Sequence, residues 1–469
     1  MTKQFIFNVK PKIISEIDLN FRPPVLANRQ FLDAVNKTKT PVLVRISIER
    51  MHKESSTYET FVFPDYEDQF DANCYYIERL VKSLLWIKGG WKITFGGPKN
   101  LGEYLQKIYT KTGLRQFDVN FMSRIYEKKF VVEIVEPNSV KLTDEISKPI
   151  GRHLDGYRIG FDAGGSDRKV SAVVNGVAIY SEEVIWHPKL QSDPMYHYDG
   201  ILSSIKSAAS KMPRVDGIGV SAAGVYIENK VMAASLFIKV PQDQFDAHIK
   251  NIFLKIAKDL GDIPIEVAND GDVTALAGAM SLDQNKVLGI AMGTSQAAGY
   301  VDQYGNITGW LNELAFVPVD YNPEASVDEW SLDYGCGVQY FSQDAAIRLA
   351  TKVGIELNEK LSPAEKLAEI QNLLAQNDQK AGLIFDTIGI YLGYAIAYYA
   401  EFYDINQLLI LGRVTSKQAG QKIIDNANLV LETEFKDLAK KIKLSLPDEK
   451  NKRVGQSIAA ASLPAILKR

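Results

Sequence analysis

The feature that most constrains this 469-residue chain is a strand, tight turn and strand pattern at residues 158–174. An apolar start leads into Asp162, Gly164, Gly165 and Ser166, and an alternating apolar run follows. This order predicts a hairpin, and not the strand, loop and helix of a Rossmann or P-loop opening. The glycines allow backbone N–H groups to approach an anion, Ser166 adds a hydroxyl, and Asp162 can hold a hydrated divalent cation. The pattern therefore indicates a phosphate-binding hairpin, although an ordinary hairpin can carry the same residues.

Length and composition predict a globular protein of two or three domains, because 469 residues exceed what one hydrophobic core usually organises. Hydrophobic residues make up 46% of the chain, and the net charge of -3 gives no overall attraction to nucleic acid or membrane. Two cysteines are too few for a disulfide framework or a four-thiolate zinc site, and the five histidines show no ligand spacing. The start of the chain is too briefly apolar for a signal peptide, and no stretch approaches a membrane span. We therefore expect a cytoplasmic protein.

Residues 1–150 predict an N-terminal α/β domain of unknown function. Strands are expected at 42–48, 91–95 and 130–135, and a helix at 75–87. The domain contains no glycine-rich phosphate loop and no assignable cluster of acids or histidines. Polar residues around Pro149 and Gly151 suggest a linker to the next domain.

The second chemically informative stretch follows a strand expected at 263–268. It reads Asn269, Asp270, Gly271 and Asp272, and a helix is expected at 273–280. Polar groups at the carboxyl end of a buried strand lie where α/β sheets bind ligands, so Asp270 is a candidate general base. Capping of the helix by Asp270 or Asp272 is the competing interpretation.

Three further turns complete the pattern. A strand at 215–220 runs into a small-residue turn at Ser221, where a ligand can approach the backbone. A strand at 287–291 leads into Gly293, Thr294 and Ser295, and then into another strand, which indicates a second phosphate hairpin with two hydroxyls. A strand at 408–411, Gly412 and a helix from 416 form a surface for a flat base. Two phosphate hairpins separated by an acid-bearing strand end are more specific than either hairpin alone.

This order of parts resembles the superfamily of sugar kinases, actin and heat-shock ATPases, and within it the ROK family of sugar kinases and repressors, over about residues 157–469. The resemblance implies a two-lobed actin-like (ribonuclease H-like) α/β fold with an N-terminal lobe at 156–280 and a C-terminal lobe at 281–469. It matches Asp162–Ser166 to the family's first phosphate motif, and Asn269 and Asp270 to the residues that hold the sugar and act as base. It also places a sugar-binding carboxylate at Glu313, next to Asn312.

The chain departs from the family pattern at several positions. Phe316 stands where the family has a histidine, and the glycine run of the second phosphate motif is eroded between Ser295 and Ala297. The cysteine-rich zinc loop is reduced to the surroundings of Cys336, so no structural zinc is expected.

The resemblance implies an ATP-dependent sugar kinase that uses Mg²⁺. In this hypothesis Asp270 is the base, and Asp162 positions Mg²⁺ through water. The sugar is contacted by Asn269, Asn312, Glu313 and Ser221. The nucleotide is bound by Asp162, Gly164, Gly165, Ser166, Gly293, Thr294, Ser295 and Gly412. The alternative is a sugar-binding regulatory protein without turnover, which the departures favour. The strand-rich front argues against a DNA-binding repressor. Members of the family are often dimers, so a homodimer is a candidate assembly.

Overall fold

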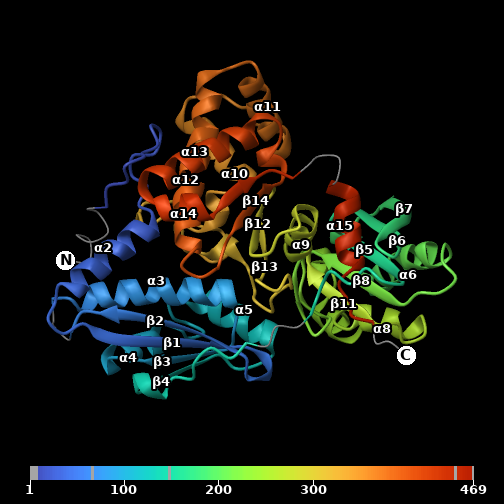
Figure 1. The fold of residues 1–469 in the computed structure, drawn as a ribbon, viewed down its shortest axis with the longest axis horizontal. Helices are drawn as coiled ribbons and strands as arrows, with labels where there is room; N and C mark the ends of the chain where they lie inside the picture. The colour runs from blue at the N-terminus through green and yellow to red at the C-terminus, as the bar shows by residue number, and fades with distance from the viewer. Residues whose placement is uncertain (1–8, 65–67, 146–148, 448–451, 467–469) are drawn as a thin grey trace.

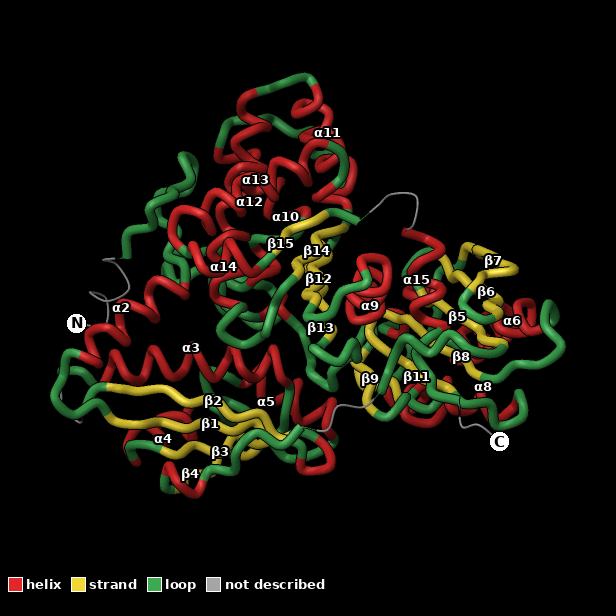
Figure 2. Tube along the Cα trace, in the orientation of Figure 1, coloured by secondary structure: helices red, strands yellow, loops and turns green. Residues whose placement is uncertain are grey.

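The computed structural model describes residues 9–64, 68–145, 149–447 and 452–466, and it consists of an N-terminal unit and two lobes (Figure 1). The N-terminal unit, blue to cyan, lies below the second lobe and beside the first. The first lobe is mostly green, and the second lobe is yellow to red. Each part contains a β-sheet of four or five strands, and Figure 2 shows helices lying against these three large sheets; β9 and β10 form a further two-stranded sheet in the first lobe.

The N-terminal unit contains a four-stranded sheet in the order β2–β1–β3–β4. The β1 strand pairs antiparallel with β2 and β3, and β3 pairs parallel with β4. The predicted strands and the predicted helix of this region are confirmed. Its elements are α2 (Pro24–Asn36), β1 (Val42–Glu49), η1 (Met51–Lys53), β2 (Ser55–Val62), α3 (Phe70–Lys88), β3 (Lys92–Gly96), α4 (Lys99–Ile108), α5 (Gln116–Tyr126), β4 (Val131–Val135) and η2 (Pro137–Ser139).

The first lobe is built on a five-stranded sheet in the order β11–β8–β5–β6–β7. The β5, β6 and β7 strands form an antiparallel meander, and β5, β8 and β11 are parallel, so the carboxyl ends of these last three meet at one edge. The elements are β5 (Tyr157–Ala163), β6 (Asp167–Val174), β7 (Val177–Ile185), η3 (Pro188–Leu190), α6 (Pro194–Ala209), β8 (Gly217–Ala222), β9 (Val225–Ile227), β10 (Lys230–Ala233), η4 (Ser235–Phe237), α7 (Gln242–Gln244), η5 (Phe245–Ile249), α8 (Ile252–Asp259) and β11 (Ile265–Asn269).

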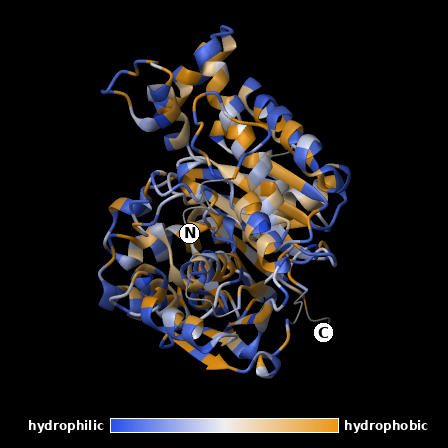
Figure 3. Cartoon of the chain, turned by 90° about the vertical axis from the view of Figure 1, so that its left-hand side faces the viewer, coloured by the Kyte–Doolittle hydropathy of each residue, from blue (hydrophilic) through white to orange (hydrophobic). Residues whose placement is uncertain are grey.

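The second lobe contains a sheet in the order β13–β12–β14–β15 that carries most of the remaining helices. Figure 3 shows hydrophobic strands in the interior and helices above them with alternating hydrophobic and hydrophilic faces. The elements are α9 (Asp270–Leu282), β12 (Val287–Met292), β13 (Gln296–Val301), η6 (Leu314–Phe316), η7 (Gly337–Gln339), α10 (Gln343–Lys352), α11 (Pro363–Ala375), α12 (Gln379–Tyr399), β14 (Gln407–Leu411), η8 (Arg413–Thr415), α13 (Gln418–Glu434), α14 (Lys436–Lys441), β15 (Lys443–Ser445) and α15 (Lys452–Ala461).

Two helices join the lobes and differ from the predicted boundaries. The α9 helix lies between the two sheets and packs on β12 and β13, although the sequence places it in the first lobe (Figure 1). The α15 helix packs on β5 and α9, so the end of the chain returns to the first lobe. The predicted C-terminal lobe at 281–469 therefore contains one helix that belongs by its contacts to the other lobe.

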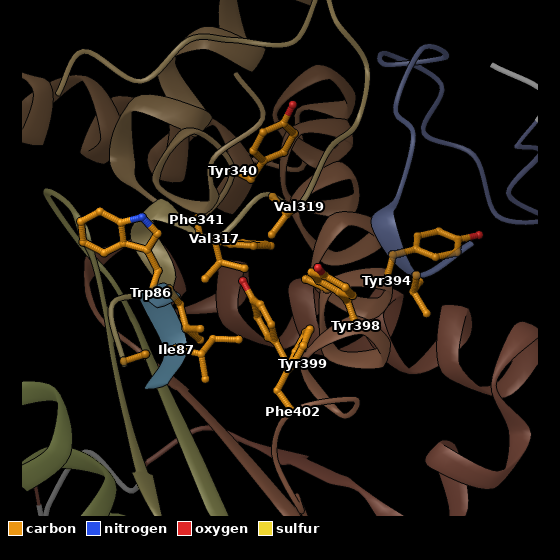
Figure 4. Packing of buried hydrophobic residues seen from close by; sticks show 14 of the residues in the cluster. Trp86, Ile87, Val317, Val319, Tyr340, Phe341, Tyr394, Tyr398, Tyr399 and Phe402 are labelled. Atoms are coloured by element: carbon orange, nitrogen blue, oxygen red, sulfur yellow. The ribbon is translucent and has the colours of Figure 1, made fainter. Parts of the chain in front are cut away.

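The N-terminal unit does not stand apart from the second lobe, because one hydrophobic cluster includes residues of both. In α3, 16 of the 19 residues are buried, which a helix on the surface of a separate domain would not require. Figure 4 shows Trp86 and Ile87 of α3 beside Val317 of the second lobe. The Ser83 Oγ atom lies 2.7 Å from the Tyr398 hydroxyl of α12. The front of the chain and the second lobe thus share a core.

The α12 helix corrects the expectation that no stretch approaches a membrane span. By length and composition it is the one helix among the described residues that is apolar enough to cross a membrane. However, 89% of its most apolar window is buried inside the protein, as is also found for core helices. It packs closely on α13 along its length.

Candidate active site

The first hairpin places a carboxylate at the carboxyl end of β5. Asp162 is opposite Ser221 of β8, and the Ser221 hydroxyl donates a hydrogen bond of 2.9 Å to Asp162 Oδ1. Burial raises the pKa of Asp162 to about 6, against the effect of this hydrogen bond, and the nearby Asp270 raises it further. Ser221, expected to contact the sugar, therefore contacts the predicted metal-positioning residue.

The turn of this hairpin is held from outside by Trp186. The Trp186 indole donates to the Gly164 carbonyl at 2.8 Å, and its backbone N–H donates to the Ser166 carbonyl at 3.1 Å. Gly165 is exposed, and a Cβ built on it would lie 3.4 Å from the Lys189 Nζ atom. A cation thus lies beside the predicted phosphate turn. The sequence analysis missed Lys189, because it follows β7 on a 3-10 turn and no local pattern connects it to residue 165.

The second strand end places Asp270 at the first position of α9, three residues earlier than the helix start expected from the sequence. Asn269 is the capping residue, and its Oδ1 atom accepts a 2.8 Å hydrogen bond from the Gly271 N–H. The Asn269 amide also donates to the Gly224 carbonyl at 2.7 Å. Because Asn269 caps the helix, Asp270 is not needed for that role. Its Oδ1 atom accepts the same Gly271 N–H, at 2.9 Å.

Burial raises the pKa of Asp270, and the Gly271 N–H opposes this effect. Glu313 also has a raised pKa, to about 7, because it is buried and because Asp270 is close. Asp270 therefore lies near enough to Asp162 and to Glu313 to raise the pKa of each. Asp162 lies near the end of β5 and Asp270 directly follows β11, two parallel strands whose carboxyl ends lie at one edge of the sheet, and Glu313 comes from the second lobe.

Asn312 and Asp272 form a buried pair behind these acids. The Asn312 amide donates to Asp272 Oδ1 at 2.9 Å, and the Tyr403 hydroxyl donates to Asn312 Oδ1 at 3.0 Å. Asp272 also accepts the Tyr300 N–H at 3.2 Å, and burial raises its pKa to about 8. Both side chains are more than nine-tenths buried. Asn312, which the sequence analysis assigned to the sugar, is thus engaged in an internal hydrogen-bond network.

The second hairpin is brought to Asp270 by a glycine contact. A Cβ on Gly271 would lie 2.4 Å from the Ala298 carbonyl oxygen, so any larger residue would separate α9 from β13. Thr294 and Ser295 are exposed at the turn, but the Gly293 N–H donates to the Ser295 carbonyl at 2.9 Å. That amide is therefore already used within the turn.

Gly412 lies in the turn predicted to face a flat base, and it packs against the second hairpin. Its φ is 99°, and a Cβ there would lie 2.3 Å from the Met292 carbonyl oxygen. Only glycine combines this backbone angle with so close an approach. The structure therefore brings Gly412 against the strand that carries Gly293 and Thr294.

A cavity of about 960 Å³ lies next to the start of α9. Its walls come from all three parts of the protein, and they include Arg50, Tyr226, Asn269, Asp272 and Trp310. Asp270 and Glu313 are not among the lining residues. Asn269 therefore borders this cavity as well as the three acids.

Among the described residues, no group of three His, Cys, Asp or Glu side chains is arranged to hold a metal ion directly. Cys74 and Cys336 are both free and buried. Asp162 is a single carboxylate beside an exposed turn, and this donor set fits a hydrated cation better than a directly coordinated one.

Comparison with solved structures identifies the fold. It is the fold of ROK proteins, which confirms the resemblance noted in the sequence at the level of structure. The ROK hexokinase from Thermus thermophilus superposes with a TM-score of 0.52 at 15% identity, over 66% of this chain and 97% of the hexokinase. A ROK family transcriptional regulator, a homologue of the E. coli MLC protein, superposes with a TM-score of 0.53 at 18% identity, over 66% of this chain and 79% of the regulator. No protein-family model matches the sequence, and no curated protein sequence matches it.

Proposed function

We propose that the protein transfers the γ-phosphoryl group of ATP to a hydroxyl of a sugar or sugar derivative. The observation that supports this proposal is the position of Asp270, which lies close enough to Asp162 and Glu313 to raise their pKa values and next to Gly271, which contacts β13 of the second hairpin. Phosphoryl transfer requires positioned phosphates, charge stabilisation and a group that accepts the hydroxyl proton. The similarity in fold to a ROK hexokinase supports the same reaction class.

In this mechanism Asp270 accepts the proton of the attacking sugar hydroxyl. Its raised pKa suits this role, because a base with a pKa nearer the working pH transfers protons more effectively. Glu313 and Asn269 orient the sugar. The backbone and hydroxyls of the two turns hold the phosphates, with the ammonium of Lys189 beside the first turn. The residues of these turns are Gly164, Gly165, Ser166, Gly293, Thr294 and Ser295.

Asp162 would hold Mg²⁺ through water, and Gly412 would face the adenine. When bound, Mg²⁺ supplies positive charge against the phosphates. Asp162 has its pKa raised to about 6, so it is ionised at neutral pH and available for this role.

A coupled ADP-release assay with Mg²⁺-ATP and a panel of hexoses, N-acetylhexosamines and acylated sugars tests the proposal. We expect one sugar to stimulate ADP release, and Asp270→Asn to lower kcat by about 10²- to 10⁴-fold. Asp283→Asn is the matched control, because Asp283 lies just beyond the other end of the same helix in a left-handed conformation that asparagine tolerates. Equal loss in both variants would contradict a specific role for Asp270.

The pH profile of the same assay gives an independent test. Because Asp270 must be ionised to act as a base, kcat/KM should fall at acidic pH. The inflection should lie above the ordinary aspartate pKa of about 3.9. An acid limb at or below that value would contradict the assignment of Asp270.

A sugar-binding regulator without turnover is the second candidate. The observation that favours it is the second hairpin, where Gly293 N–H is used internally and Gln296 is buried in the eroded glycine run. The similarity in fold to a ROK transcriptional regulator also supports it. This candidate predicts that a sugar raises the thermal midpoint while no sugar stimulates ADP release. A cytoplasmic location and a homodimer remain predictions, which cell fractionation and light scattering would test.

A further inference from the structure

The contacts of Glu313 lead to an inference about the N-terminal unit, and it rests on the proposed function. We infer that Trp86 of α3 is a positioning residue for Glu313, so that the N-terminal unit forms part of the sugar site. The region from which Trp86 comes lies outside the part of the sequence that resembles ROK proteins.

The first observation concerns the end of α3. The last carbonyl groups of a helix lack partners within the helix, and Trp86 and Ile87 are fully buried, so water cannot reach them. The Trp86 carbonyl accepts a 3.0 Å hydrogen bond from the Glu313 N–H, and the Ile87 carbonyl accepts one of 3.0 Å from the Asn312 N–H. Residues 312 and 313 therefore complete the helix end, and each segment fixes the other.

The second observation concerns the Trp86 side chain. Its ring lies 4.3 Å from the ring of Phe316, measured between centroids, which is three residues after Glu313. Trp86 therefore contacts this segment at two points. Its carbonyl binds the Glu313 N–H, and its ring packs on Phe316, which follows Glu313. Figure 4 shows Trp86 and Ile87 at the boundary between α3 and the second lobe.

The third observation explains why Trp86 itself cannot shift. Its indole N–H donates a 2.5 Å hydrogen bond to Asp118 of α5, and Asp118 is only 2% exposed. On the far side of Glu313, the Asn312 side chain is bonded to Asp272, two residues after Asp270. Glu313 is therefore held between the helix of the proposed base and the N-terminal unit.

Trp86→Phe tests the inference, because it keeps an aromatic ring on Phe316 and removes the hydrogen bond to Asp118. Phe121→Leu is the matched control. Phe121 packs on the same indole at 5.0 Å, but no ring contact joins it to Phe316. Both variants reduce packing around the indole, and only the first removes the hydrogen bond that fixes residue 86 to Asp118.

With the sugar found by the panel, we expect Trp86→Phe to raise the sugar KM by about tenfold to a hundredfold, the usual cost of a small misplacement. The KM for ATP should stay within about twofold of the wild-type value, since the nucleotide contacts are untouched. Phe121→Leu should change neither constant. Equal effects of the two variants on the sugar KM would overturn the inference and leave Trp86 a packing residue.

Hydrogen exchange provides a measurement that needs no activity. In the wild type the amides of residues 312 and 313 should be protected, because they are bonded to α3. Trp86→Phe should speed their exchange by about tenfold or more, and Phe121→Leu should not. If these amides exchange equally in all three proteins, the inference is wrong. If the wild type shows no turnover, the proposed kinase function fails separately, and the exchange result still decides the role of Trp86.

Discussion

Two groups of carboxylates in this protein differ in the direction of their pKa shifts. The first is represented by Asp333, which forms a buried charge cluster with Glu78, Arg79, Lys82 and Arg115. Burial would raise the pKa of Asp333, but Lys82, Arg79 and Arg115 together hold it well below its usual value. The second group is Asp270, Asp272 and Glu313, where burial raises each pKa and no ion pair compensates within the described residues.

The difference distinguishes an acid whose charge is paired inside the fold from acids without an ion-pair partner, among them the proposed site residues Asp270 and Glu313. Arg79 binds both oxygens of Asp333 at 3.0 Å, and Arg115 binds one at 2.8 Å, so the charge of Asp333 is fully used inside the fold. Asp270, Asp272 and Glu313 are removed from water to different degrees without a pairing cation, a pattern that is frequent in binding and catalytic sites. The buried charge cluster also holds the loop around Cys336 in place. Asp333 of this loop forms ion pairs with Arg79 and Lys82 of α3 and with Arg115, which directly precedes α5.

The largest expected effect is therefore at Asp333. Asp333→Ala leaves three buried cations without their shared partner, and we expect it to lower the free energy of unfolding by about 3–5 kcal/mol. Urea denaturation monitored by circular dichroism measures this loss. A change below about 1 kcal/mol would mean that the buried charge cluster contributes little to stability, and Asp333 would then not differ from the unpaired acids in the way described above.

In contrast to Asp333→Ala, Glu313→Gln should make the protein more stable and weaken sugar binding. At pH 8 the carboxylate, with a pKa of about 7, is mostly ionised and has no ion-pair partner, so the neutral amide should raise the thermal midpoint by about 1–3 °C. The sugar KM should rise by about tenfold, because a hydrogen bond to a charged group is lost. A lower midpoint together with an unchanged KM would show that Glu313 is a structural acid like Asp333.

Asp272 predicts a pH dependence of stability. Its pKa is about 8 in the folded protein and about 4 in the unfolded chain, so between these values the folded state binds a proton that the unfolded state has released. This contribution to stability is complete at low pH and is lost as the pH rises towards 8. Asp272→Asn should retain a midpoint about 2–5 °C above the wild type at pH 9, with a smaller difference at pH 5. Parallel pH curves for both proteins would contradict the assignment.

The smallest effect is expected where the N-terminal unit meets the first lobe. There Lys250 pairs with Glu127, and His52 lies 2.6 Å from Glu228, but three of these four side chains are 40% exposed or more. Lys250→Met should change the free energy of unfolding by less than about 1 kcal/mol, and the change should diminish with added salt. If Lys250→Met lowered the free energy of unfolding as much as Asp333→Ala does, the exposed contact with the first lobe would be as important for stability as the buried charge cluster, and the contrast between the two contacts would be wrong.

Some predictions from the sequence failed for identifiable reasons. The amphipathic pattern of residues 245–260 predicts one continuous helix, but the structure has a π-turn followed by the separate helix α8, because the Lys250 carbonyl accepts a hydrogen bond from the Val231 N–H of β10. The helix expected from residue 273 begins at Asp270, because Asn269 supplies the cap. The first error comes from a distant strand, which no local pattern contains. The second comes from a choice among three neighbouring polar residues, Asn269, Asp270 and Asp272, that only the backbone geometry resolves.

The sequence by itself determined the two hairpins, the strand ends that carry Asp162 and Asp270, and the glycine at 412. These depend on turn residues and apolar periodicity within a few positions, which a local pattern contains. Only the tertiary structure decided that the front of the chain shares a core with the second lobe, that α15 returns to the first lobe, and that Trp86 contacts Glu313. Arg79 and Asp333 are 254 residues apart, and contacts of this kind arise from packing whole elements together.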